Sequence, residues 1–469
     1  MELIRSIKAT QTAIANGQIT CAALVKECLT NIQLNEHLNA YLEVFGNEAQ
    51  EKAAEIDQKI AAGNAGKLAG CIIALKDNIC YQGHKLGASS KILAGFESQF
   101  SATVVERLLA EDAIIIGRTN CDEFAMGSST ENSAFGPTLN ADDNNLVPGG
   151  SSGGSAVAVQ AGLCHVALGS DTGGSIRQPA AFCNLVGLRP TYGHVSRWGL
   201  IAYASSFDQI GPLANNSHDA KLVMQIMSGF DSNEATSSTT VVNYNTPAEK
   251  PKKVAFIKNC IQHEAVDAEI KQRFEEKAAE LEAQGIEVDW IDFPYVDYAV
   301  PNYYVLTTAE ASSNLSRFAG MLYGHRSKES TDIASTIIKS RSEGFGDEVQ
   351  RRIMLGTFVL SAGYYDAYYT KAQQVRRLIS DYTFKLLKDY EYIMLPTAPH
   401  TAFKMGANAD PIAMYLEDIF CIQASLAGIP AVSVPLKTHS NGLGIGMQIM
   451  SNKFTDHYLL DFAEQFERK

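Results

Sequence analysis

The residues best suited to chemistry lie in two short segments rich in glycine and serine, 149–155 (GGSSGGS) and 169–175 (GSDTGGS). Glycine lets backbone N–H groups approach a ligand closely, and a serine hydroxyl attacks a carbonyl carbon once a base accepts its proton. A third feature is Lys76, which directly follows the apolar run CIIAL (71–75). Burial disfavours an ammonium, so a lysine placed there could act as a base near neutral pH. A lysine at the end of a strand, taken alone, is more commonly exposed to solvent.

Three interpretations of these segments compete. A phosphate-binding loop is disfavoured because its motif, G-x-x-x-x-G-K-[ST], does not occur, and the GK at 66–67 is followed by leucine. The second interpretation is the nucleophile elbow of an α/β-hydrolase, since 149–153 (GGSSG) satisfies G-x-S-x-G. An elbow needs a strand that runs into the serine, whereas the preceding segment is NADDNNLVP (140–148), and no downstream histidine is marked out by its neighbours. The third interpretation combines both loops with Lys76.

The elements around these segments alternate between buried strands and helices. Short apolar runs occur at 71–75, 113–117 and 164–169, and helix-like segments lie between them at 104–111 and 152–161. Continuous apolar runs are typical of strands in a sheet that is covered by helices on both faces. We therefore predict an α/β fold with a large central sheet, largely parallel or mixed, that carries helices on both faces.

One interwoven domain, 1–469, is predicted from the order of these elements. Its parts are a helical N-terminal segment (1–65), a core with the glycine and serine loops (66–230), a βα unit with a helical region (252–390), and C-terminal strands with a closing helix (391–469). We expect the C-terminal strands to rejoin the first sheet.

The composition limits the possible functions. A chain of 469 residues, 46% of them hydrophobic, can bury a large core without metals or disulfides. The formal net charge of −13, without a dense Lys/Arg cluster, argues against direct nucleic-acid binding. The nine cysteines never form C-x-x-C, which indicates buried thiols in a reducing compartment rather than a zinc site or a disulfide framework. No secretory signal and no run of about 18 apolar residues occurs, so we expect a soluble, cytoplasmic protein without a membrane segment.

Three segments around these residues resemble the amidase signature family: ALKDN (74–78), PGGSSGGSA (148–156) and GSDTGGSIRQPAAF (169–182). The spacing also fits, because Ser151 and Ser175 lie 24 residues apart and Lys76 precedes Ser151 by 75 residues. The resemblance extends over nearly the whole chain. It implies the amidase-signature fold, in which a large central mixed β-sheet is covered on both faces by helices.

The resemblance also implies a Ser-Ser-Lys relay. Ser175 would be the nucleophile, Ser151 would conduct its proton, and Lys76 would be the final base. Amide hydrolysis would then proceed through an ester on Ser175. The oxyanion hole would be formed by the backbone N–H groups of Thr172, Gly173, Gly174 and Ser175.

Further segments resemble the branch of the family that hydrolyses glutamine to supply ammonia for tRNA-dependent transamidation: 122–140, 187–214 and 351–369. By this resemblance Arg352 would bind the carboxylate of free glutamine, Asp418 would bind its ammonium, and Tyr303 would add a hydroxyl contact. The adjacent Arg351 and Tyr304 leave two of these assignments open by one position. The segment before the first serine loop, ADDNNLVP (141–148), departs from the family, which leaves its anchoring open.

This branch implies a heterotrimer. A B subunit would bind tRNA, ATP and magnesium, a small C subunit would brace the pair, and this chain would meet tRNA only through the complex. No metal and no cofactor is expected in this chain. The assembly would convert misacylated Glu-tRNA(Gln) or Asp-tRNA(Asn) to Gln-tRNA(Gln) or Asn-tRNA(Asn) in an ATP-dependent reaction. Either acceptor fits the sequence, and so does either amide donor, glutamine or asparagine.

Two alternatives stay open. The first is a stand-alone amidase of the same family that acts on small, aryl or peptide amides. Such an enzyme would have no reason to hold both Arg352 and Asp418. The second is a catalytically inactive scaffold that only stabilises a partner, and the intact Lys76, Ser151 and Ser175 argue against it.

Overall fold

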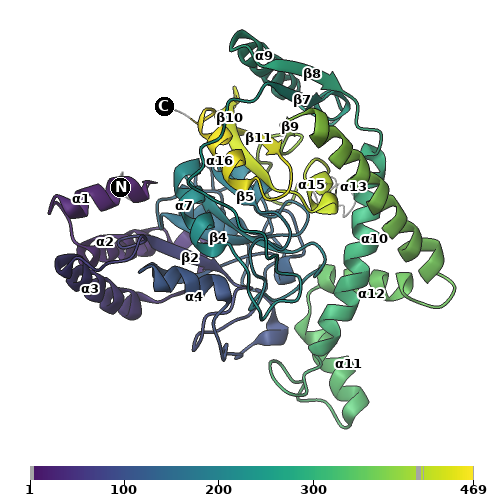
Figure 1. The fold of residues 1–469 in the computed structure, drawn as a ribbon. Helices are drawn as coiled ribbons and strands as arrows, with labels where there is room; N and C mark the ends of the chain where they lie inside the picture. Colours follow the sequence, from purple (N-terminus) through teal and green to yellow (C-terminus); the bar gives the residue numbers. More distant parts are fainter. Residues whose placement is uncertain (1–4, 408–413, 416, 468–469) are drawn as a thin grey trace.

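A sheet of eleven strands runs through the computed structural model, which describes residues 5–407, 414–415 and 417–467. The strands lie in the order β1-β3-β2-β4-β6-β5-β10-β11-β9-β7-β8 (Figure 1). β2 runs parallel to β3 and β4, and β7 runs parallel to β8 and β9, whereas the other neighbours are antiparallel. The predicted α/β fold with a mixed sheet is therefore confirmed. The strands are β1 Tyr41–Val44, β2 Ile72–Lys76, β3 Ile114–Thr119, β4 Val166–Asp171, β5 Val186–Arg189, β6 Gln209–Ala214, β7 Lys253–Ile257, β8 Glu287–Ile291, β9 Tyr392–Pro396, β10 Ala431–Thr438 and β11 Gly444–Met450.

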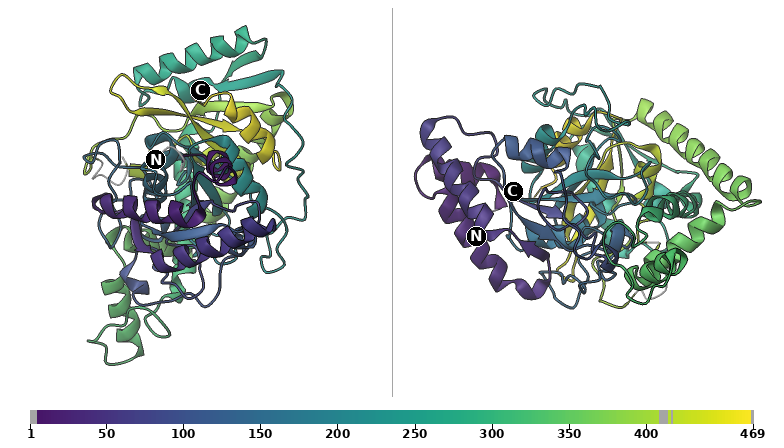
Figure 2. Two further views of the ribbon diagram at one scale, coloured as in Figure 1. Left: turned by 90° about the vertical axis from the view of Figure 1, so that its left-hand side faces the viewer. Right: turned by 90° about the horizontal axis from the view of Figure 1, so that it is seen from below.

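Helices surround this sheet, and Figure 2 shows the N-terminal helices α1–α3 on the opposite side of the molecule from the green helices α10–α13. Within the described ranges, none of the helices combines the length and the apolar character needed to cross a membrane. The α-helices are α1 Ile7–Ala15, α2 Cys21–Leu34, α3 Gly46–Ala62, α4 Thr103–Ala110, α5 Gly153–Gln160, α6 Arg177–Phe182, α7 Ser217–Met227, α8 Lys258–Ile261, α9 Ala268–Ala283, α10 Val296–Asn314, α11 Ile333–Gly344, α12 Asp347–Val359, α13 Lys371–Asp389, α15 Ile422–Ala427 and α16 Asp456–Glu464.

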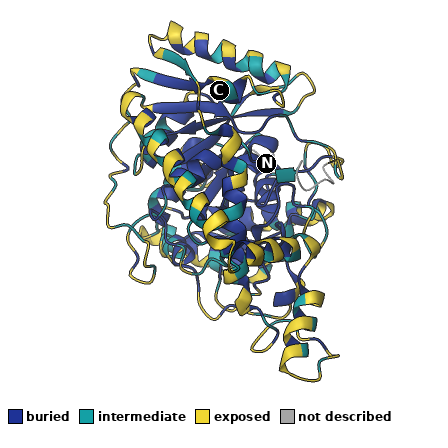
Figure 3. Ribbon diagram, turned by 90° about the vertical axis from the view of Figure 1, so that its right-hand side faces the viewer, coloured by how far each residue is buried: buried dark blue, intermediate teal, exposed yellow. Residues whose placement is uncertain are grey.

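The residues of β2 explain why the sheet is covered on both faces. Successive side chains of a strand point to opposite sides, and all five residues of β2 are buried. Ile72 and Ala74 belong to one core together with residues of α2 and α5, whereas Ile73 and Leu75 belong to a second core together with residues of α4. In Figure 3 the central strands are accordingly dark blue, and exposed residues lie mainly along the helices outside them.

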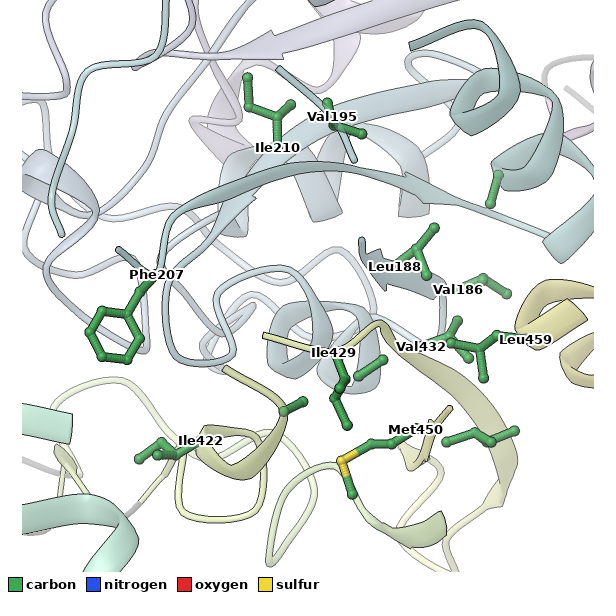
Figure 4. Packing of buried hydrophobic residues seen from close by; sticks show 14 of the residues in the cluster. Val186, Leu188, Val195, Phe207, Ile210, Ile422, Ile429, Val432, Met450 and Leu459 are labelled. Carbon is green, nitrogen blue, oxygen red and sulfur yellow. The ribbon is translucent and has the colours of Figure 1, made fainter. Parts of the chain in front are cut away.

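The C-terminal strands lie in the same sheet as β2 and β4, because β10 pairs with β5 and β11 pairs with β10. Their apolar side chains pack together in the close view of Figure 4. There Val186 and Leu188 of β5 lie near Val432 of β10, with Met450 of β11 and Leu459 of α16 in the same cluster. Segments far apart in the sequence thus share one core.

The N-terminal segment differs from the helical one predicted from the sequence, because it contains β1 as well as α1–α3. β1 pairs antiparallel with β3 and places Tyr41 opposite Thr119. Its sequence, YLEV, is short and carries no turn signals of its own. The strand forms because its backbone hydrogen-bonds to β3, which is distant in the sequence. A local sequence pattern cannot reveal such pairing.

The parallel pairing of β2 with β4 determines where the predicted catalytic residues lie. The carboxyl ends of parallel strands meet at one edge of the sheet, and Lys76 ends β2 while Asp171 ends β4. The chain continues from β4 through 172–176 into α6, and the first serine loop leads directly into α5 at Gly153. The lysine and both loops therefore meet at this edge.

Candidate active site

The amine of Lys76 lies in a buried shell of serine and backbone oxygens. Its Nζ is 2.7 Å from Ser151 Oγ, 2.9 Å from Ser152 Oγ and 3.5 Å from the Ser170 carbonyl oxygen. Lys76 and both serines are fully buried. The structure therefore brings two of the three predicted catalytic residues, Lys76 and Ser151, into hydrogen-bond contact.

The surroundings of Lys76 favour its neutral form. Burial lowers the pKa of Lys76 to about 8, although nearby acidic groups such as Asp122, Asp171 and Asp208 act in the opposite direction. Around pH 7 about a tenth of such amines are uncharged. A neutral amine can accept a proton from a hydroxyl, which an ammonium cannot, so this lysine is suited to act as a base.

The predicted nucleophile lies beside this pair. The backbone N–H of Ser152 donates to the Ser175 carbonyl oxygen at 3.2 Å, and Ser175 is only 4% exposed. Among the described residues the Ser175 hydroxyl has no hydrogen-bond partner, so the contact between Ser151 and Ser175 is not closed in this structure. Such catalytic hydrogen bonds commonly tighten only when substrate is bound.

The loop that carries Ser175 is held by a buried ionic cluster. Arg177 and Arg189 both approach Asp171 at 2.9 Å, and all three side chains are fully buried. Burial alone would raise the pKa of Asp171, but the two guanidinium groups hold it below its ordinary value. At the next residue, Thr172 Oγ1 donates to Asp208 Oδ1 at 2.7 Å. These contacts fix the shape of the predicted oxyanion loop.

The backbone of this loop leaves donors free. Gly174 has φ of +153°, a conformation that other residues rarely adopt. Within the described part of the chain, the N–H groups of Gly173, Gly174 and Ser175 donate to no protein acceptor. They are therefore available to an oxyanion.

The segment before the first serine loop is anchored despite its departure from the family pattern. The Val147 N–H donates to the Phe403 carbonyl oxygen at 3.0 Å, and the Gly150 N–H donates to Gln178 Oε1 at 2.9 Å. A Cβ atom on Gly150 would collide with the Asp122 carboxylate, so glycine is required there. The Gly150–Ser151 peptide is cis.

Two of the predicted substrate residues lie against the oxyanion loop. A Cβ atom placed on Gly173 would be 2.6 Å from Tyr303 Oη, and one placed on Gly174 would be 2.8 Å from Asp418 Oδ1. The side chains of Tyr303 and Asp418 therefore border the segment that leads to Ser175. Tyr304 instead stacks on Tyr415, with ring centroids 4.0 Å apart, so the geometry favours Tyr303 as the residue facing the loop.

The third predicted substrate residue, Arg352, is buried in an aromatic cage. Its guanidinium lies 5.2 Å from the ring centroid of Tyr304, 5.4 Å from that of Tyr415 and 5.6 Å from that of Tyr203. Arg352 Nε donates to Glu348 Oε1 at 2.8 Å, and Arg352 Nη1 donates to Tyr203 Oη at 2.9 Å.

The neighbouring Arg351 has a different environment. Its side chain is 48% exposed and it pairs with Glu348 at the surface. Of the two adjacent arginines, only Arg352 is buried, and it is enclosed by Tyr203, Tyr304 and Tyr415. The geometry thus favours Arg352 as the carboxylate-binding residue.

Sequence reasoning assigned no role to several residues that support the site. They are Ser152, which contacts Lys76; Ser128, which contacts Asp418; and Glu348 and Tyr203, which contact Arg352. Ser152 could have been found from its place in GGSSGGS, and Glu348 from its spacing of four residues to Arg352 on one helix, whereas Ser128 and Tyr203 contact partners far along the chain. Among the described residues, no three His, Cys, Asp or Glu side chains are grouped as metal ligands, and the nine cysteines are buried and unpaired.

Comparison with known proteins identifies the class of this enzyme. The chain belongs to the amidase family, whose model matches residues 23–460. This match confirms the resemblance found in the sequence, and the site described above lies wholly within the matched range.

The relatives with high identity are more specific. The chain is 49% identical over 464 residues to a protein from Chlorobium luteolum named as the A subunit of glutamyl-tRNA(Gln) amidotransferase, a match that covers 98% of this chain and 96% of that protein. The crystal structure of the A subunit of glutamyl-tRNA(Gln) amidotransferase from Thermotoga maritima is 41% identical, with a TM-score of 0.77 and coverage of 94% and 93%. Native peptide amidase from Stenotrophomonas maltophilia is 26% identical, with a TM-score of 0.82 and coverage of 98% and 96%.

Proposed function

We propose that this chain is the glutamine-hydrolysing component of a tRNA-dependent amidotransferase. The observations that carry the proposal are that the buried Asp418 borders the predicted catalytic loop, and that the buried Arg352 and Asp418 both interact electrostatically with Tyr303, which borders the same loop. An α-amino acid carries both a carboxylate and an ammonium. Asp418 can pair with the ammonium, and Arg352 can donate to the carboxylate through the N–H groups that Glu348 and Tyr203 leave free. The relatives named as A subunits of glutamyl-tRNA(Gln) amidotransferase support the same function.

The proposed reaction uses the residues of this site in two stages. Arg352 binds the α-carboxylate of glutamine, Asp418 binds its α-ammonium, and the Tyr303 hydroxyl adds a contact. Ser175 Oγ then attacks the side-chain amide carbon while its proton moves to Ser151, and the Ser151 proton moves to Lys76. The free N–H groups of the loop stabilise the oxyanion.

The second half of the reaction returns the enzyme to its starting state. The C–N bond breaks as the leaving nitrogen takes the proton from Lys76 through Ser151, which releases ammonia and leaves a γ-glutamyl ester on Ser175. Water then attacks this ester, its proton follows the same path to Lys76, and glutamate leaves as Ser175 recovers its hydroxyl proton.

Partner subunits complete the proposed function. A B subunit would bind tRNA, ATP and magnesium and receive the ammonia, and a C subunit would brace the assembly. The formal net charge of −13 is consistent with leaving tRNA contact to a partner. The names of these relatives support Glu-tRNA(Gln) as the acceptor, with Asp-tRNA(Asn) as the alternative.

Co-expression with the proposed B and C subunits tests this function. Ammonia release from glutamine is measured with and without misacylated Glu-tRNA(Gln) and ATP, beside the same assay with simple aryl and peptide amides. Stimulation by tRNA and ATP together supports the proposal. Efficient turnover of simple amides without tRNA would instead favour the stand-alone amidase.

Replacing Arg352 tests the proposed carboxylate contact. Arg352→Lys keeps a positive charge but loses the planar fork that matches a carboxylate, so we expect kcat/KM for glutamine to fall by about 100-fold, mainly through KM. Arg351→Lys is the matched control, because its side chain is exposed, and it should leave both constants unchanged. Equal losses in the two variants would contradict the assignment.

A further inference from the structure

Ser128 forms a hydrogen bond with one oxygen of the Asp418 carboxylate. The Ser128 hydroxyl donates to Asp418 Oδ2 at 2.7 Å, and Ser128 is 1% exposed. Its own backbone is fixed as well, because Gln178 Nε2 donates to the Ser128 carbonyl oxygen at 3.0 Å. Gln178 Oε1 in turn accepts from the N–H of Gly150, the residue before Ser151. These contacts fix the position of Ser128 relative to the first serine loop.

The other oxygen of Asp418 is left without a partner. Asp418 Oδ1 is buried and accepts no hydrogen bond from any residue in the described ranges. It faces the loop before the nucleophile, since a Cβ atom on Gly174 would lie 2.8 Å from it. A buried carboxylate oxygen without a donor is unfavourable, so this atom is suited to receive an N–H donor from a ligand.

We propose that Ser128 is a positioning residue that makes this site selective for amides carrying an α-ammonium group. It occupies Oδ2, sets the rotation of the carboxylate, and leaves Oδ1 aimed at the place where the ammonium binds. The inference rests on the proposed function, in which Asp418 is the partner of the glutamine ammonium.

The hydrogen bond from Ser128 also affects the charge of the Asp418 carboxyl group. Burial raises the pKa of Asp418 to about 7, and the hydrogen bond from Ser128 acts against that rise. An ammonium is bound by a carboxylate but not by a neutral carboxylic acid. Removal of the Ser128 hydroxyl would therefore both free the carboxylate to rotate and disfavour its charged form. The other ionisable groups that interact with Asp418 are Asp171, Arg177, Tyr303, Tyr304, Glu417 and Cys421.

Two substrates separate this role from a merely structural one. They are glutamine and glutaramate, which is glutamine without its α-amino group, and both are assayed with the co-expressed assembly. We expect Ser128→Ala to lower kcat/KM for glutamine about 10-fold, through KM, and to leave kcat/KM for glutaramate unchanged. Retained turnover of glutaramate also shows that the variant is folded.

Ser129→Ala is the matched control. Ser129 is the next residue and is fully buried, but its hydroxyl has no hydrogen-bond partner in the described ranges, so the variant removes the same atom without disturbing Asp418. It should keep the wild-type ratio of kcat/KM for the two substrates.

Each outcome has a distinct meaning. Equal losses on both substrates in Ser128→Ala, or no loss on glutamine, would overturn the role of Ser128 while the proposed function stands. A wild-type enzyme that does not prefer glutamine to glutaramate would remove the ammonium-binding role of Asp418, and with it both the residue assignment in the proposed function and this inference.

Discussion

Ser175→Ala should lower the rate of glutamine hydrolysis by about 10⁴-fold or more, because the variant has no hydroxyl to form the ester. Binding should persist, since the residues assigned to the carboxylate and the ammonium are untouched. The measurement is ammonia release under saturating glutamine, together with glutamine affinity by calorimetry.

The same substitution should leave the fold intact. The Ser175 hydroxyl has no hydrogen-bond partner among the described residues, so its removal breaks no contact within them. The thermal unfolding midpoint should match that of the wild type. A variant that unfolds normally but retains more than about a tenth of the activity would show that another group is the nucleophile.

Lys76→Met should also inactivate the enzyme, by about 10³-fold, because methionine fills the space of the lysine stem but cannot accept a proton. The same substitution should raise the free energy of unfolding, although it lowers the activity. A pKa lowered from 10.5 to about 8 corresponds to about 3 kcal/mol against folding while the amine is charged in both states. Unfolding in urea at pH 7 should therefore show Lys76→Met to be more stable than the wild type, by up to about 3 kcal/mol less the cost of the lost contacts to Ser151 and Ser152.

The pH dependence of that difference follows from the direction of the shift. The folded state loses the Lys76 proton at lower pH than the unfolded state, so the penalty is complete below about pH 8 and is relieved as the pH rises toward 10.5. The stability advantage of Lys76→Met should shrink over this range. A stability difference between the two proteins that does not change between pH 8 and pH 10.5 would contradict a Lys76 pKa lowered by burial.

The sequence predicted the parts of the structure that depend on local pattern. The apolar run 71–75 became β2, and the Gly-Ser segments became the loops that lead into α5 and α6. Lys76 and Ser151 meet because both lie at the carboxyl edge of one pair of parallel strands. The type of sheet and the position of the site could therefore be inferred before any contact was seen.

The parts that could not be predicted depend on contacts between distant segments. Strand β1 exists through its pairing with β3. Ser128 and Asp418 are separated by 290 positions in the sequence, and Arg352 and Tyr203 by 149. Polar residues that act through such partners have no periodic or local signature. The choice between Arg351 and Arg352 likewise depends on which side chain is buried. Adjacent residues of a helix point in different directions, so here one arginine is exposed and the next is buried.

Direct titration of the Lys76 amine tests the central claim most closely. Protein labelled with ¹³C at the lysine ε-carbons is followed by NMR across the alkaline range, and the Lys76 resonance is identified by its loss in Lys76→Met. We expect this one resonance to titrate with a pKa of about 8. A Lys76 resonance that titrates near 10.5, like an exposed lysine, would contradict a relay that ends in an uncharged amine.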